Sequence, residues 1–162
     1  MLAALEALVK LESPTEDLAA CQDVVRLASE LATTILGTPA QIRDVNGRPV
    51  FWWGAENPDV VVLAHLDTVW PKGSFTPLWK VEGNKATGPG IFDMKAGFIQ
   101  ALYAMKGITG SAALVATTDE ETGSATSREF IKEISAKAKA VLVLEASLNG
   151  MVKTGRKGTA MY

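Results

Sequence analysis

The chain contains a single histidine, His65, and its position is one expected of a metal ligand. It directly follows the apolar run 60–64, and Asp67 comes two residues later. Several acids also follow apolar runs or a glycine-rich turn: Asp93, Asp119, Glu120, Glu121 and Glu145. Imidazole and carboxylate groups together suit zinc, and carboxylate-rich sites also admit manganese or cobalt. The residue types therefore indicate a hydrolytic metal site, provided that the fold brings them together.

The order of the apolar runs predicts a fold that would do so. Continuously apolar segments at 60–64, 112–117 and 141–144 are typical of buried strands, and they alternate with helical patterns at 94–105 and from about residue 126 to 135. This alternation predicts an α/β fold with a mostly parallel, mixed sheet flanked by helices. Ligands of open α/β sheets collect beyond the carboxyl ends of the strands. Acids that follow separate strands can therefore meet His65 at one edge.

The remaining elements follow from local signals. Leucines and a valine at helical spacing predict a helix near residues 2–9, and Ser13-Pro14-Thr15-Glu16 is typical of a capping box that opens a second helix ending near Gly37. Asn46-Gly47 predicts a tight hairpin between strands 41–45 and 50–53. Residues 65–93 form a long loop with a small hairpin near Gly83, and 151–154 and 158–162 have the composition of strands.

Spacing also suggests a chemical role for individual residues. Residues two apart on a strand face the same side, so Asp67 can lie beside the His65 ring and fix its tautomer. Of the adjacent Glu120 and Glu121, one can bind a metal while the other accepts a proton from an activated water.

Each of these residues also has an ordinary structural interpretation. A histidine at a strand end is more often structural than a ligand. Asp67 and Asp93 could be turn or N-cap residues, and Asp93 is well placed to cap a helix that begins at Met94. The acids at 119–121 could form a solvated turn, and Glu145 could cap one. These interpretations would have to hold independently at four separate places, so the joint pattern favours the metal site.

Composition excludes several other classes of function. The chain has 162 residues, a length typical of one domain, and 16 basic against 18 acidic side chains give a net charge of −2. No basic block suited to nucleic acid or anionic lipid is present, and no apolar run approaches the ~20 residues that span a bilayer. The single Cys21 cannot form an internal disulfide, and the N-terminus does not resemble a signal peptide. We therefore expect a cytoplasmic protein without nucleic-acid or membrane partners.

Four segments of the chain, taken together, resemble the M20 metallopeptidases. They are residues 65–69 (HLDTV), 88–97 (GPGIFDMKAG), 118–123 (TDEETG) and 144–145 (LE), and residues 67–73 (DTVWPKG) are most similar to the glutamate carboxypeptidase (carboxypeptidase G2-like) branch. The resemblance implies zinc-dependent hydrolysis of a peptide or amide bond, with release of a C-terminal amino acid such as glutamate. Desuccinylases and deacetylases share the motifs, so an N-acyl amino acid amidase is an alternative. A non-catalytic metal-binding fragment is another.

The resemblance also implies a role for each site residue. His65 and Glu145 would bind one zinc ion, Glu121 a second zinc ion, and Asp93 both. Glu120 would act as general base and acid, and Asp67 would orient His65. The peptide bond after Asp93 is often cis in the family.

The chain differs from members of this family in length. Family members are at least about twice as long, with a lid domain used for dimerisation and a return segment that supplies the last metal-binding histidine. This chain has no second histidine. We therefore expect residues 1–162 to be the N-terminal portion of a zinc-peptidase catalytic domain, with the lid domain and return segment absent. Such a fragment would hold one zinc ion better than two and would be weakly active or inactive, and dimerisation should not be assumed for it.

Overall fold

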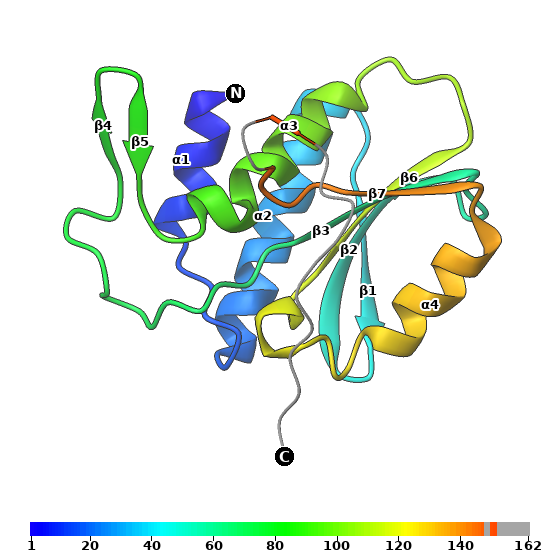
Figure 1. Ribbon diagram of the computed structural model, residues 1–162, viewed down its shortest axis with the longest axis horizontal. Coiled ribbons are helices and arrows are strands. Elements are labelled where there is room, and N and C mark those ends of the chain that lie inside the picture. The colour runs from blue at the N-terminus through cyan, green and yellow to red at the C-terminus, as the bar shows by residue number, and fades with distance from the viewer. Residues whose placement is uncertain (148–149, 152–162) are drawn as a thin grey trace.

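A five-stranded mixed sheet forms the centre of the chain in the computed structural model, which describes residues 1–147 and 150–151 (Figure 1). The strand order is β1-β2-β6-β3-β7, with β3 parallel to both β6 and β7 and the other pairs antiparallel. The strands are β1 (Gln41–Val45), β2 (Arg48–Gly54), β3 (Val60–His65), β6 (Ala112–Thr117) and β7 (Ala140–Val143). A separate two-stranded hairpin consists of β4 (Lys80–Glu82) and β5 (Lys85–Thr87).

Helices cover both faces of this sheet. Helices α1 (Leu2–Lys10), α2 (Leu18–Leu36) and α3 (Ala96–Ala104) lie on one face, and α4 (Arg128–Lys137) lies on the other (Figure 1). Two short turns of helix, η1 (Ile91–Lys95) and η2 (Glu120–Thr122), lie in the loops at the end of the sheet where β3 and β6 finish.

Alternation along β2 shows how one strand supplies both cores. Phe51 points to the three-helix face and meets Phe98 edge-on with ring centroids 5.1 Å apart. The next residue, Trp52, points to the other face and packs edge-on against Phe130 of α4 at 6.1 Å. Because successive side chains of a strand face opposite sides, a fully apolar strand must be covered on both. The helices on both faces confirm the predicted α/β class with a mixed sheet, although only the pairs of β3 with β6 and β7 are parallel.

Several local predictions are also confirmed. The Asn46-Gly47 turn joins β1 to β2 with positive φ at both residues, 52° and 85°, as a tight two-residue hairpin requires. Helix α2 ends at Gly37, whose φ of 83° gives the left-handed C-cap. The small hairpin near Gly83 is present as β4 and β5.

Three predictions were wrong. Helix α2 begins at Leu18, with the Asp17 side chain accepting a hydrogen bond from Ala20 N–H, so residues 13–16 are not its capping box. Helix α3 begins at Ala96, and the Asp93 side chain does not cap it. Strand β7 is not buried: it pairs only with β3 among the described residues, and Leu142 and Val143 are more than half exposed.

The strands predicted at 151–154 and 158–162 lie outside the described residues, apart from Met151. Within residues 1–147 and 150–151, none of the helices has the length and apolar character needed to cross a membrane.

Candidate metal centre

The centre lies where three parallel strands end side by side. His65 is the last residue of β3 and is paired in register with Thr117, the last residue of β6. Glu120 follows β6 in the turn η2, and Glu145 follows β7 by two residues. Asp93 comes from a different direction, on the turn η1 that precedes α3. The predicted convergence at the carboxyl edge of the sheet therefore occurs.

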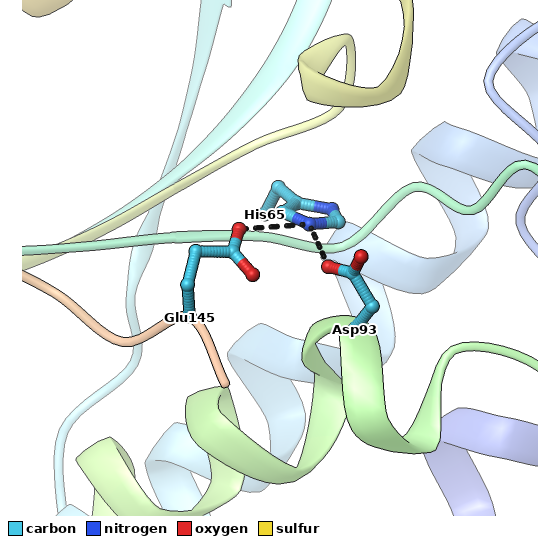
Figure 2. Close-up of side chains that lie close together, drawn as sticks. All are labelled: His65, Asp93 and Glu145. Atoms are coloured by element: carbon cyan, nitrogen blue, oxygen red, sulfur yellow. Dashed lines mark hydrogen bonds and ion pairs between the residues drawn. The ribbon is translucent and has the colours of Figure 1, made fainter. Parts of the chain in front are cut away.

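Three side chains point toward one another at this edge (Figure 2). His65 Nε2 lies 3.0 Å from Asp93 Oδ1 and 3.4 Å from Glu145 Oε1. One donor atom from each of these residues lies within 4.8 Å of the others. The imidazole is buried, with 1% of its side chain exposed, whereas the carboxylates of Asp93 and Glu145 are 57% and 32% exposed. The group is therefore anchored on the protein side and open on the other.

The second nitrogen of His65 is turned toward Asp67. His65 Nδ1 lies 3.1 Å from the Asp67 main-chain oxygen and 3.3 Å from Asp67 Oδ1. The Asp67 carboxylate is buried, and its Oδ2 accepts hydrogen bonds from the Thr15 hydroxyl at 2.8 Å and from Glu121 N–H at 3.2 Å. Two acceptors facing Nδ1 favour a proton there, so that in the neutral ring the lone pair belongs to Nε2 on the cluster side.

The acids strongly affect the protonation of His65. Burial by itself lowers the pKa of His65, but the hydrogen bonds to Asp67, Glu145 and Asp93 outweigh it and raise that pKa to about 11. Burial raises the pKa of Asp67, yet the bond and charge of His65, with the Thr15 and Glu121 donors, hold it below its usual value. Without a metal, the imidazolium is thus the positive charge that balances the carboxylates.

The acids at 119–121 have three different surroundings. Asp119 is buried, and its carboxylate accepts hydrogen bonds from the N–H groups of Thr126 and Ser127 and from the Ser127 hydroxyl. Glu120 Oε2 lies 3.8 Å from His65 Nε2. The main-chain N–H of Glu121 donates a hydrogen bond to the Asp67 carboxylate, which lies beside His65. The turn is therefore not simply a solvated acidic loop.

Both glutamates of η2 are harder to ionise than free ones. Burial raises the pKa of Glu120, and nearby Glu145, Asp67 and Asp93 add to the rise while His65 opposes it. Burial likewise raises the pKa of Glu121, together with the charges of Asp93, Glu120 and Asp67 and against that of His65. The carboxylates gathered around one imidazole form a concentration of negative charge that a divalent cation would relieve.

Glycine at position 97 allows Glu145 to approach the cluster. A Cβ built on Gly97 would lie 2.5 Å from the Leu144 main-chain oxygen, closer than real Cβ atoms come. The first turn of α3 therefore contacts the backbone that carries Glu145. The Asp93–Met94 peptide bond is cis, as the resemblance implies.

Sequence reasoning missed the residues that support the cluster. The capping-box pattern assigns Thr15 to the start of a helix, whereas its hydroxyl contacts Asp67. Lys95 is fully buried, and its Nζ donates to the carbonyls of Leu8 and Leu11 at the end of α1, which ties the Asp93 turn to that helix. Burial lowers the pKa of Lys95 to about 8. Its place two residues after Asp93, in an otherwise apolar helix start, was the available signal.

The donor set and its spacing fit a zinc-like cation. Two ligands held about 2.1 Å from one tetrahedral zinc ion lie about 3.4 Å apart. The distances from His65 Nε2 to Asp93 and Glu145 are 3.0 Å and 3.4 Å. Catalytic zinc ions are commonly bound by imidazole and carboxylate groups, and the second nitrogen of the imidazole usually contacts a further carboxylate. His65, Asp93 and Glu145, with Asp67 beside His65 Nδ1, match this arrangement.

The sequence profile of the peptidase family M20/M25/M40 matches residues 61–159. The chain belongs to this family. Carboxypeptidase G2 of Pseudomonas sp. (strain RS-16) is 36% identical over 105 residues, a match that covers 60% of this chain and 25% of that protein. The predicted resemblance to the M20 family is thereby confirmed, and carboxypeptidase G2 is a relative of this chain.

Solved structures of other peptidases share the fold. The M20 family metallo-carboxypeptidase Sso-CP2 from Sulfolobus solfataricus superposes with a TM-score of 0.74 at 21% identity, over 91% of this chain and 37% of that one. Human carnosine dipeptidase 1 gives a TM-score of 0.69 at 16% identity, over 88% of this chain and 37% of that one. The di-peptidase Dug1p from Saccharomyces cerevisiae gives 0.61 at 16% identity, with the same coverage. The chain thus spans well under half the length of these relatives.

Proposed function

We propose that this chain carries the metal-binding part of a zinc-dependent peptidase that releases a C-terminal amino acid, with glutamate as the first candidate. The observation that carries the proposal is the convergence of His65, Asp93 and Glu145 within reach of one ion, at the strand edge where α/β enzymes bind ligands. The similarity to carboxypeptidase G2 supports the choice of a carboxypeptidase over an N-acyl amino acid amidase.

Each residue takes a role that its surroundings support. His65, Asp93 and Glu145 would hold one cation, and Asp93 with Glu121 would contribute to a second. Zinc is the first candidate because the set combines an imidazole with carboxylates, and cobalt or manganese can replace it. A bound cation of this kind acts as a Lewis acid and makes water nucleophilic near neutral pH. Asp67 keeps the His65 ring in the orientation that leaves Nε2 facing the cluster.

Glu120 is the residue proposed to move the proton. Its carboxylate is 41% exposed on the open side of the cluster, 3.8 Å from His65 Nε2, so water and substrate can reach it. Its raised pKa brings it closer to neutrality, where a group can both accept a proton from water and return it to the leaving amine. Glu121, with its N–H committed to Asp67, is the better candidate for a fixed ligand.

We further propose that residues 1–162 are the N-terminal portion of a zinc-peptidase catalytic domain. The supporting observations are that the chain covers 37% of each solved relative and that it contains one histidine. The second cation would then have only Asp93 and Glu121 as ligands from this chain, fewer than the three or four that zinc sites normally have. Translating the encoding DNA beyond Tyr162 tests this directly. A continuation with lid and histidine-bearing segments supports the proposal, a continuation that lacks both contradicts it, and a stop codon favours the non-catalytic metal-binding fragment.

The activity test compares two substrate classes on the longest protein that contains this chain. Peptides ending in glutamate and N-acetyl or N-succinyl amino acids are offered with zinc, and released amino acid is measured. The proposal predicts preference for the peptides and a loss of about 100-fold or more in kcat for Glu120→Gln with zinc affinity retained. Preference for the N-acyl substrates would favour the amidase, and full activity of Glu120→Gln would contradict the role of Glu120.

A further inference from the structure

Thr15 connects the candidate metal centre to the segment that precedes α2. Its hydroxyl donates to Asp67 Oδ2 at 2.8 Å, and the whole residue is 4% exposed. Asp67 is fully buried, so no bulk water competes for its carboxylate. The orientation of that carboxylate is therefore set by the donors that the protein supplies, and Thr15 supplies the shorter of the two hydrogen bonds to Oδ2.

Thr15 is itself held firmly beside Asp67. The segment 13–15 runs parallel to 66–68, with Thr68 N–H donating to the Ser13 carbonyl at 2.9 Å and Thr15 N–H donating to the Thr68 carbonyl at 3.2 Å. The Ser13 hydroxyl adds a 2.6 Å bond to the Leu66 carbonyl. Hydrogen bonds to the two neighbours of Asp67, two main-chain bonds at Thr68 and the Ser13 hydroxyl bond at Leu66, thus fix where the Thr15 hydroxyl can lie.

Arg48 joins this segment to a residue between β6 and the turn η2, which carries Glu120 and Glu121. Its Nη1 donates to the Thr15 carbonyl at 2.7 Å and to the Thr118 carbonyl at 3.0 Å. Thr118 follows the end of β6 and precedes the turn whose Glu121 N–H also donates to Asp67 Oδ2. One half-buried guanidinium therefore ties together the two segments whose donors meet on the same carboxylate oxygen.

We propose that Thr15 is a positioning residue of the metal centre. Its hydroxyl, anchored through Arg48, holds the Asp67 carboxylate so that the other oxygen faces His65 Nδ1 and Nε2 faces the cluster. The proposal rests on the proposed function, because it assigns Thr15 a role in a metal site. Partners that orient a ligating histidine typically change metal affinity by about 10- to 100-fold when removed. A valine keeps the shape of threonine and loses the donor, so it isolates this effect.

The test measures the affinity of the 162-residue chain for zinc ions alone, by calorimetry with a competing chelator. Thr15→Val is compared with Thr15→Ser, which keeps the hydroxyl, and with Thr68→Val. The Thr68 hydroxyl is also buried but has no hydrogen-bond partner among the described residues, so its loss controls for a change from threonine to valine at this place. A second readout is the His65 Nδ1 proton in the zinc-loaded chain by NMR, which the single histidine makes unambiguous.

The proposal predicts zinc affinity about 10-fold or more weaker in Thr15→Val, and within about threefold of wild type in Thr15→Ser and Thr68→Val. It also predicts faster solvent exchange of the Nδ1 proton in Thr15→Val only. Equal affinities in all four chains would overturn it, as would equal losses in Thr15→Val and Thr15→Ser. If Thr15→Val does not fold, a crystal structure of the wild-type chain decides, since a Thr15 Oγ1–Asp67 separation beyond hydrogen-bond distance overturns the proposal. Failure of the wild-type chain to bind zinc would instead contradict the proposed function.

Discussion

His65 Nε2 lies 3.0 Å from Asp93 Oδ1, although the two residues are 28 positions apart in the chain. The intervening segment leaves β3, forms the β4–β5 hairpin and returns on the turn η1. Lys95 fixes that return by donating to two carbonyls of α1 and its C-terminal end. The contact between His65 and Asp93 therefore depends on a buried lysine that takes no part in the cluster.

Metal binding should release a proton from His65. Hydrogen bonds to the surrounding acids raise the pKa of His65 to about 11 despite its burial, so the metal-free ring is charged at neutral pH. A ligating imidazole must be neutral, so near pH 7 binding should release about one proton, and affinity should rise about 10-fold per pH unit below the pKa. Calorimetry in buffers of different ionisation enthalpy measures this number. Zero released protons with pH-independent affinity would contradict the charged state of the metal-free ring.

Gly97 should be intolerant of a side chain because of Glu145. A Cβ there would meet the Leu144 carbonyl oxygen at 2.5 Å, so Gly97→Ala must push away the segment that carries Glu145. We expect zinc affinity to fall by about 10-fold or more. Gly110→Ala is the matched control, since a Cβ on Gly110 would have nothing within 4 Å and the residue is not in the left-handed region. Unchanged affinity in Gly97→Ala would mean that Glu145 does not bind the metal.

Asp119 should matter for stability and not for the metal. Its buried carboxylate accepts three hydrogen bonds, from Thr126 N–H, Ser127 N–H and the Ser127 hydroxyl. Asp119→Ala leaves those donors unpaired, so we expect the free energy of unfolding in urea to fall by about 2 to 4 kcal/mol. Zinc affinity, measured well below the denaturation midpoint, should stay within about threefold. A large loss of affinity at unchanged stability would reverse this assignment.

Periodicity and turn chemistry predicted most of the fold, because the strands are continuously apolar and the turns carry Asn-Gly or a terminal glycine. The same reasoning placed the acids at the strand ends, since parallel strands share one carboxyl edge. It failed at residues 13–16, where Ser-Pro-Thr-Glu matches a capping box but its hydroxyls bond to Leu66 and Asp67 instead. Local pattern could not reveal these partners, which lie more than 50 positions away.

The burial of β7 was also mispredicted for a physical reason. An apolar run of four residues indicates that both faces of a strand can be covered. It does not identify the segment that covers them. In the described part of the chain, Leu142 and Val143 have more than half of their surface exposed. The support given by Lys95 was missed although its apolar neighbours were a signal, because a lysine after Asp-Met is also typical of a solvated helix start.

Zinc titration of the purified chain and of His65→Ala tests the central claim most directly. His65 supplies the only imidazole of the chain, and its Nε2 lies within 3.8 Å of carboxylate oxygens of Asp93, Glu120 and Glu145. We predict about one tightly held zinc ion per wild-type chain. In His65→Ala, zinc affinity should fall by more than about 100-fold, which exceeds the loss caused by removing a residue that only orients a ligand. Equal zinc affinity of the two chains would contradict the metal centre described here.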